Sequence, residues 1–532
     1  MNKSWTVGVS SAHRRIINFL LAGLAFLQAA AVHATSLEES VATTLESNPE
    51  IGIVGANRQA IDQELRQARA QYFPSLDARA AGGPEYTNSP ATRNRDGSET
   101  LLRLESQLTL SQMLFDGFST QNEVDRQLAR IDSASHRVRE TAEFVGLDAI
   151  EAHLDILRNQ SLVALAVQNI EDHQRISDQV GRLEREGAGS IADVTQADAR
   201  LAAAQSALAS ARGSLRDAEA AYRAVVGTLP AELEEPVVPV VAVPESAEAA
   251  AAKASAENPT VRIADADIEV AKAELEGSRS GYYPRLDLEL GAGANRNLDG
   301  IEGSDIDAQA LLVMRYNLFR GGADVARERE SFFRLSEARE ELARVRRQAV
   351  EDALVSYSAL LTARDRVLAL RDQAEATRAT RNAYAQQFDL GQRSLLDLLD
   401  AENELFVARS NLVTSEYTEM FAVYRVLAVI GDLLMALDID APKESIDIWR
   451  QPAEDIHERP AGADQAAVSP VAARSRIAAD LRDPGVAAGS ARAFAPGPRS
   501  SADPGRWQGF LDALTESGAA IDSQGMAGPT AD

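Results

Sequence analysis

Hydrophobic and polar residues alternate with a period of two in short segments of both halves of this chain, which predicts β-strands with one apolar and one polar face. The apolar positions are Leu102, Leu104, Leu108, Leu110 and Leu114 in the first half, and Leu286, Leu288, Leu290, Ala292, Ala294, Ile306, Ala308, Ala310, Leu312 and Met314 in the second. We expect two such strands in each half. Strands of about ten residues with one apolar face are typical of a transmembrane barrel. The alternative is a half-buried hairpin on a soluble core.

Two very long helices are predicted at about 118–187 and 321–391, because the first shows heptad steps and no proline interrupts either segment. The first seam comprises Val124, Leu128, Ile131, Ser135, Val138, Ala142, Val145, Ala149, Ala152 and Ile156, and a second seam beside it contains Leu147, Ile150, Leu154 and Leu157. Two seams allow a helix to pack against neighbours on both sides, as the wall of a helical cylinder requires. For the seams alone, an ordinary soluble coiled coil is the alternative.

Shorter helices accompany each strand pair and each long helix. A helical stretch is predicted at about 49–71 and again at 259–281, ended by Pro74 and Pro284. After each long helix, a glycine turn precedes a returning helix whose seam alternates leucine and alanine, which permits close helix approach. The seam positions are Val194, Ala197, Leu201, Ala204, Leu208, Ala211, Leu215, Ala218, Tyr222 and Val225 in the first half, and Leu398, Ala401, Leu405, Ala408 and Leu412 in the second.

The second half of the chain repeats the first. The Asn-Pro pair at Asn48 returns 210 positions later at Asn258, and the Leu-Phe-x-Gly segment that begins at Leu114 returns 204 positions later at Leu318. A match of this length indicates a duplicated structural unit. We therefore predict a first repeat over residues 35–227, a linker with a short helix over 228–257, a second repeat over 258–449 and a largely disordered tail over 450–532.

Residues 1–34 have the layout of a secretory signal peptide. Basic residues precede an apolar run that leads to a small-x-small site ending at Ala34, so cleavage is expected after that residue. An uncleaved membrane anchor is the alternative, although the apolar run is short for a spanning helix. The formal net charge of −26 disfavours nucleic acid and anionic lipid headgroups as partners, and the absence of cysteine excludes a disulfide framework.

Four strands per chain cannot close a barrel, because about eight strands are the minimum. The chain is therefore expected to form an oligomer, and three copies with twelve strands are the natural count. The polar turns between the strands would face outward.

No constellation of residues points to catalysis. The six histidines are scattered without the spacing of metal ligands, and the Gly-Ala-Gly-Ser segment at 187–190 lacks the lysine of a phosphate-binding loop. No arrangement of a nucleophile with a histidine and a carboxylate can be assembled. We expect neither enzymatic activity nor a metal or cofactor.

The residues that we single out for function lie around the second glycine turn. Asp397 and Asp400 are three positions apart at the start of a helix, so they share one face beside a terminus that favours carboxylates. Helix capping alone would explain them in an isolated helix. In a threefold assembly, six carboxylates would instead ring the narrow end of a tube and attract cations. Asp193, the equivalent of Asp397 in the first half, could pair with Arg393.

With these motifs in hand, the chain resembles the TolC family of outer-membrane efflux and secretion channels over about 36–445. The resemblance rests on Asn-Pro before the first helix, Tyr-Phe-Pro or Tyr-Tyr-Pro before each strand pair, Leu-Phe-x-Gly before each long helix, and Leu-Gly-Gln-Arg-Ser-Leu-Leu-Asp-Leu-Leu-Asp-Ala at 390–401. It implies a mainly α fold with a small β part: a homotrimer in which four strands per chain build a twelve-stranded outer-membrane barrel on a long periplasmic helical barrel. It also implies contact with outer-membrane lipid, a periplasmic adaptor and an inner-membrane transporter of the ABC or RND type, and a tip that opens like an iris.

The resemblance implies roles for individual residues. Arg393 and Asp193 match a latch pair, and Asp397 and Asp400 match two aspartates that line the entrance constriction. Phe388 stands where some family members have a latch tyrosine, and Ala192 where they have a threonine, so both latch hydroxyls are missing here. The turn residues expected to contact the adaptor are Gly187, Gly189, Ser190, Gly391, Gln392 and Ser394.

These features favour a passive exit duct of a tripartite export system, opened at its tip by partner docking. The stretch 390–406 is most similar to the type I secretion branch. Drug efflux is the other export function that the sequence allows. A soluble periplasmic coiled-coil scaffold or adaptor is the alternative of a different class. A general diffusion porin is disfavoured by the strand number and the long helices.

Overall fold

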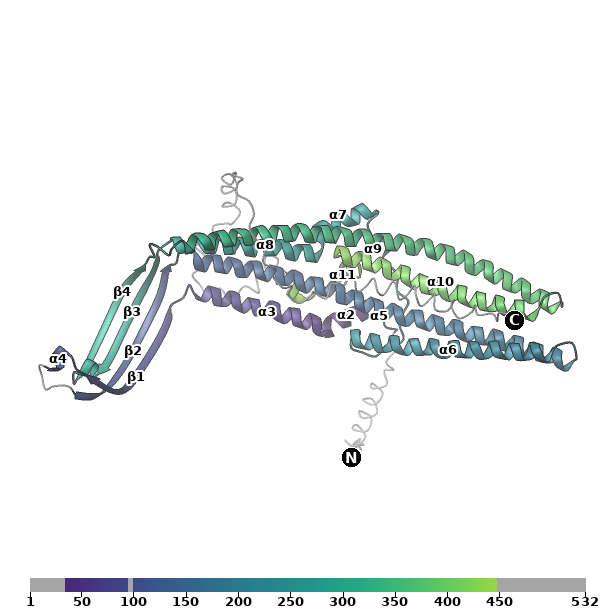
Figure 1. Ribbon diagram of the computed structural model, residues 1–532, viewed down its shortest axis with the longest axis horizontal. Coiled ribbons are helices and arrows are strands. Elements are labelled where there is room, and N and C mark those ends of the chain that lie inside the picture. Colours follow the sequence, from purple (N-terminus) through teal and green to yellow (C-terminus); the bar gives the residue numbers. More distant parts are fainter. Residues whose placement is uncertain (1–33, 94–98, 447–532) are drawn as a thin grey trace, which may run out of the picture. The chain divides into compact units, whose positions relative to one another are not determined.

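The computed structural model describes residues 34–93 and 99–446, which form a mainly helical protein with one four-stranded sheet (Figure 1). The helices are α2 (Leu37–Ser47), α3 (Pro49–Ala70), α4 (Pro90–Arg93), α5 (Ser119–Arg185), α6 (Ile191–Val226), α7 (Ala247–Glu257), α8 (Pro259–Ser278), α9 (Ala323–Asp389), α10 (Leu395–Ile430) and α11 (Leu433–Ala436). The strands are β1 (Ser75–Thr87), β2 (Glu99–Phe115), β3 (Arg285–Arg296) and β4 (Ser304–Arg315). The predicted signal peptide up to residue 33 and the predicted tail 450–532 lie outside the described residues.

The chain divides into two compact units. The hairpin unit contains α2, α6, the second part of α5 from Gly146, the second part of α9 from Thr362, and α10 up to Tyr424. The sheet unit contains the four strands, α3, α7, α8, α11, the first parts of α5 and α9, and the end of α10.

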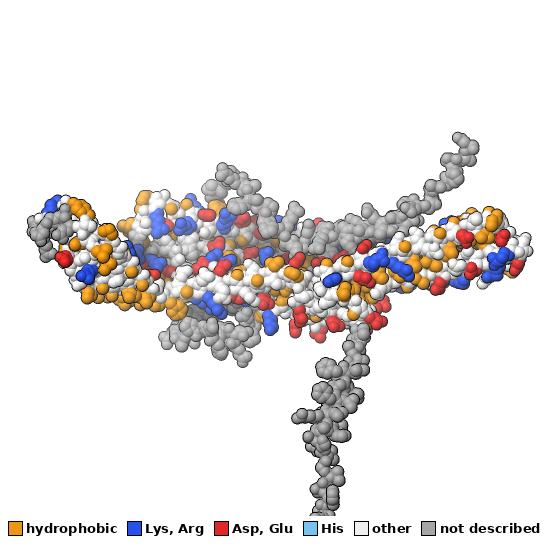
Figure 2. Space-filling view, turned by 90° about the horizontal axis from the view of Figure 1, so that it is seen from below, with side chains coloured by type: hydrophobic (Ala, Val, Ile, Leu, Met, Phe, Trp, Pro, Cys, Tyr) orange, Lys and Arg blue, Asp and Glu red, His pale blue; other side chains and the backbone are white. Residues whose placement is uncertain are grey.

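All four strands of the sheet unit are antiparallel, in the order β1-β2-β3-β4. The register aligns equivalent faces across the sheet: Leu110 lies opposite Leu290, which lies opposite Ala310. The other face carries polar residues such as Asp77, Arg79, Gln107, Glu289 and Asp307. The prediction of one apolar and one polar face is therefore confirmed. Apolar side chains are visible along the strand region at the left of Figure 2.

The long helices are confirmed at 67 residues each. On α5 both predicted seams are buried over most of their length: Ile131, Ser135, Val138, Ala142, Val145, Ala149, Ala152 and Ile156 in the first, and Leu147, Ile150, Leu154 and Leu157 in the second. In the sheet unit, Ile131 and Ala134 of α5 pack against Ile61 and Leu65 of α3. The seam of α6 is less complete, because Ala197, Ala204 and Ala218 are buried but Ala211 and the three seam leucines are only half-buried.

The shorter helices also follow the prediction, with α3 and α8 beginning at the two Asn-Pro pairs. The Asn258 side chain caps α8 by accepting hydrogen bonds from the backbone N–H groups of Thr260 and Val261, at 2.8 and 3.3 Å. Helix α2 was not predicted. Its signal was Ser36 with Glu39 three positions later, a capping pattern, and the Ser36 hydroxyl does accept from the Glu39 N–H at 3.2 Å.

The repeated motifs meet where the strands join the long helices. The ring of Tyr283 packs edge-on against those of Phe115 and Phe118, with centroids 6.4 and 5.9 Å apart. Gly117 has φ of 69°, and a Cβ there would lie 2.7 Å from the Ser280 carbonyl oxygen. The glycine of Leu-Phe-x-Gly is therefore required by both its backbone conformation and this close approach.

None of the described helices combines the length and the apolar character that crossing a membrane would require.

Candidate functional site

The two hairpin turns, at 186–190 and 390–394, have the same backbone geometry. Gly187 and Gly391 adopt left-handed conformations, with φ of 78° and 70°. The next residue donates its N–H to the carbonyl five positions earlier, Ala188 to Leu183 and Gln392 to Gln387, both at 2.8 Å. These are the bonds that end a helix at a glycine, so the sequence repeat is also a repeat of turn structure.

Each turn is followed by a capped helix. Ser190 caps α6 together with Asp193, whose carboxylate accepts from the Ser190 N–H at 3.4 Å. In the second turn the Asp397 N–H donates to the Ser394 hydroxyl oxygen at 3.2 Å, and that hydroxyl donates to the Asp397 carboxylate at 2.9 Å. Asp193 and Asp397 therefore both take part in helix capping, the simpler of the two interpretations that the sequence left open.

Arg393 makes its contacts inside its own hairpin. Its Nε donates to Gln387 Oε1 at 3.1 Å, and its Nη1 lies 3.7 Å from Asp397 Oδ2. The guanidinium carbon is 4.0 Å from the ring centroid of Tyr384, a cation–π contact. Within one chain, the structure thus gives Arg393 and Asp193 different partners, and the latch between them stays a prediction.

Asp400 has a partner that the sequence did not suggest. Its Oδ1 accepts from Nη2 of Arg200 on α6 at 2.8 Å, and both side chains are partly exposed. The contact joins α6 of the first hairpin to α10 of the second. No local spacing predicts a pair between residues 200 positions apart, so this contact could be found only from the fold.

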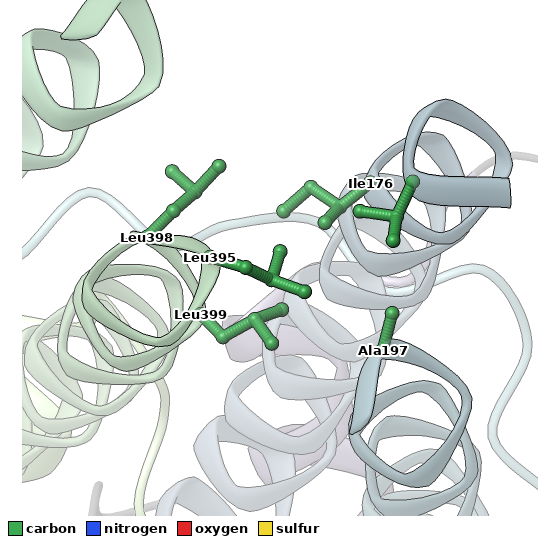
Figure 3. Close-up of a cluster of buried hydrophobic side chains, with 6 residues drawn as sticks. Ile176, Ala197, Leu395, Leu398 and Leu399 are labelled. Carbon is green, nitrogen blue, oxygen red and sulfur yellow. The ribbon is translucent and has the colours of Figure 1, made fainter. Parts of the chain in front are cut away.

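Phe388 packs against an apolar cluster whose buried members are drawn in Figure 3. The buried members come from three helices: Ile176 and Val180 on α5, Ala197 on α6, and Leu395, Leu398 and Leu399 on α10. Phe388 and Tyr384 of α9 pack against them. At the position of the missing latch hydroxyl, Phe388 therefore makes apolar contacts, and these hold the two hairpins together by burying surface.

Further from the turns, a charged network joins three helices of the hairpin unit. Arg381 on α9 donates from Nε to Glu402 on α10 at 2.5 Å, and its Nη2 lies 3.6 Å from Asp172 on α5. Glu402 is only 3% exposed, so this is a buried ion pair. Burial lowers the pKa of the nearby Arg409 guanidinium, and the positive charges of Arg378 and Arg381 lower it further.

A second buried network ties α2 to α5 and α6. His153 Nε2 lies 3.0 Å from the carbonyl oxygen of Glu234, which can only accept, so Nε2 carries the proton. Its Nδ1 then accepts from the hydroxyl of Ser40 at 3.0 Å, and that oxygen lies 3.0 Å from the hydroxyl of Tyr222. His153 is fully buried, so this Ser-His contact is structural. Within residues 34–93 and 99–446, no three histidine or acidic side chains are grouped to hold a metal ion.

Two long helical hairpins that repeat one another, in a chain that also forms an antiparallel sheet with one apolar face, are the features that the family assignment must explain. The chain belongs to the outer membrane efflux protein family, whose sequence profile matches residues 41–228 and 250–431. This confirms the family resemblance, the outer-membrane location and the channel function, and it does not favour a soluble scaffold.

Individual relatives agree with this assignment. The chain is 28% identical over 420 residues to the outer membrane efflux protein BepC of Brucella suis biovar 1 (strain 1330), which covers 77% of this chain and 88% of that protein. It is 24% identical to the outer membrane protein TolC of Vibrio cholerae serotype O1, over 78% of this chain and 94% of that one. The crystal structure of CusC shares the fold, with a TM-score of 0.65 at 15% identity over 75% of this chain and 92% of CusC.

Proposed function

We propose that three copies of this chain form an outer-membrane channel that serves as the passive exit duct of a tripartite export system. Its partners would be a periplasmic adaptor, contacted through Gly187, Gly189, Ser190, Gly391, Gln392 and Ser394, and an inner-membrane transporter of the ABC or RND type. Arg393, Asp193 and Phe388 would act at the gate, while Asp397 and Asp400 would line the constriction. The cargo would be a secreted protein or a small molecule.

The observation that carries this proposal concerns the Leu-Phe-x-Gly motif, which is covered by other residues of the chain in the first half and exposed in the second. In the first half, Phe115 and Gly117 are covered by residues 280–283 of the second half. In the second half, the equivalent Phe319 is 84% exposed, and a Cβ on Gly321 would meet nothing within 4 Å. Because the halves are repeats, the missing cover is the equivalent first-half segment of another copy, which contains Phe73, itself 53% exposed.

The sheet supports the same arrangement. In the described chain β1 and β4 are the outer strands and pair on one side only. Head-to-tail contacts between identical copies form a ring when the rotation between neighbours closes, and pairing β4 of one copy with β1 of the next would continue the sheet around such a ring.

The experiment is crosslinking in a chain that has no cysteine of its own. The variant Phe73→Cys with Phe319→Cys, treated in membranes with a short bis-maleimide, is expected to give covalent dimers and trimers on a denaturing gel. The matched control is Phe115→Cys with Tyr283→Cys, a pair in contact within one chain, which should give a crosslinked monomer. If the Phe73→Cys/Phe319→Cys variant stays monomeric while the control crosslinks within its chain, and the protein does not fractionate with membranes, the proposed channel is wrong.

A further inference from the structure

The predicted constriction carboxylates each have a guanidinium beside them. Asp397 Oδ2 lies 3.7 Å from Arg393 Nη1, and Asp400 Oδ1 lies 2.8 Å from Arg200 Nη2. A ring of aspartates attracts cations only as far as its charge is not already compensated. In three copies, each of the six predicted constriction aspartates would therefore have an arginine beside it that offsets its charge.

The two arginines differ in where they are attached. Arg393 precedes Asp397 by four positions at the end of the same turn, so the two move together. Arg200 reaches Asp400 from the other hairpin, across the seam between α6 and α10. Separation of the hairpins would break only the second pair.

The position of Arg200 is set by buried neighbours. Ala197, three positions before it, is buried in the apolar cluster, and so is Leu399, the residue before Asp400. The cluster brings the two helix surfaces together, and the ion pair lies beside it, with side chains 39% and 51% exposed. Exposed ion pairs contribute little to stability, so holding the hairpins together falls to the cluster, while the pair determines the local charge.

We propose that Arg200 is a built-in counter-ion of Asp400, which suppresses cation binding at the constriction while the hairpins are packed together and exposes the carboxylate when they separate. This inference rests on the proposed channel and on the placement of Asp400 at its constriction. It makes Arg200 a determinant of ion selectivity that changes with the state of the gate.

The test is block of single-channel current in planar bilayers by hexaamminecobalt(III), a compact trivalent cation, added on the side of the helical tip. For Arg200→Gln the half-blocking concentration should fall about tenfold relative to wild type, because one carboxylate per chain loses its counter-ion. Arg200→Lys, which keeps the charge, should restore the block to near the wild-type level. Arg212→Gln, an exposed arginine further along the same helix, is the matched control and should behave as wild type.

The double variant Arg200→Gln with Asp400→Asn separates this inference from a general loosening of the tip. Removal of the exposed carboxylate should cancel the gain in block, whereas a loosened tip would keep it. A conducting Arg200→Gln channel with wild-type block, or a double variant that retains the gain, would overturn the role of Arg200 and leave the channel function standing. A wild-type protein without any conductance would overturn the channel and this inference together.

Discussion

At the scale of single residues, two buried side chains titrate in ways that differ from their free forms. Glu143 is 1% exposed, and burial raises its carboxyl pKa from 4.5 to about 8, although its Oε2 accepts from the Leu433 N–H at 2.9 Å at the start of α11. Burial lowers the pKa of His153 below its ordinary value of 6.5. In both cases the buried group favours its neutral form, so protons bind differently to the folded and unfolded chains.

For Glu143 the predicted consequence is a loss of stability as the pH rises. Between pH 4.5 and about 8 the folded state keeps a proton that the unfolded state has released, so the free energy of unfolding should fall across this window and level off above it. Glu143→Gln keeps an acceptor for the Leu433 N–H and removes the titration. Thermal unfolding of the detergent-solubilised protein by circular dichroism should show the variant more stable than wild type at pH 8, with a flatter dependence on pH.

The predicted latch can be tested at Arg393 and Asp193 separately. Arg393→Ala loses the bond to Gln387 and the contact with the Tyr384 ring, and Asp193→Ala loses the bond from the Ser190 N–H that completes the capping box of α6. Each is expected to loosen the tip and raise the mean single-channel conductance in planar bilayers, with Arg212→Ala as the control. If neither variant changes the conductance, the latch role of both residues is wrong.

At the scale of helices, the buried charged network of Arg381 should contribute more to stability than the exposed ion pairs around it. Arg381→Gln removes the hydrogen-bonded counter-ion of the buried Glu402 and leaves only the charge of Arg409 nearby, so the cost should approach the about 3–5 kcal/mol that is typical of a broken buried pair. Arg371 pairs with Glu416 between the same two helices at 2.9 Å, but with side chains 58% and 34% exposed, so Arg371→Gln should cost about 0–1 kcal/mol. Chemical unfolding of the two variants in detergent measures the difference in the free energy of unfolding. Equal midpoints would show that the Arg381 network does not stabilise the contact between the helices.

The helices themselves were largely predictable because they are long and periodic. Heptad steps in α5 and a duplicate of the whole pattern gave two independent indications for each element. Contacts between the hairpins were not predictable in this way. Each of these contacts, such as Arg200–Asp400 and Arg381–Asp172, links two different helices. Whether such residues meet depends on the rotation of each helix about its axis, which no local pattern specifies.

At the scale of the whole molecule, the two faces of the sheet should respond oppositely to the same charge. Leu312 lies on the apolar face and is 67% exposed in the single chain, whereas Gln309 lies on the polar face opposite Gly291. Leu312→Arg should place a cation in lipid three residues from the end of β4, at a cost below the about 2–4 kcal/mol that applies at the bilayer midplane. Gln309→Arg should be tolerated. Heat-resistant trimer in outer-membrane fractions is the readout, and equal yields would contradict the assignment of the apolar face to lipid.

At the level of the sequence, the proposed assembly rests only on strand number and family resemblance. The structure adds a physical reason: the packed Leu-Phe-x-Gly motif of the first half has a bare counterpart in the second. Such an asymmetry cannot be predicted from the sequence, because the two copies of the motif have nearly the same residues and differ only in which residues cover them.

The two turns differ in sequence at three of their five positions, and one of these is Gly189 in the first turn and Arg393 in the second. A Cβ on Gly189 would lie 2.9 Å from the backbone nitrogen of Glu184, so the first turn cannot accept a side chain there without shifting. Arg393, the proposed gate residue, therefore has no equivalent in the first half, where a side chain at the matching position would require the backbone to shift.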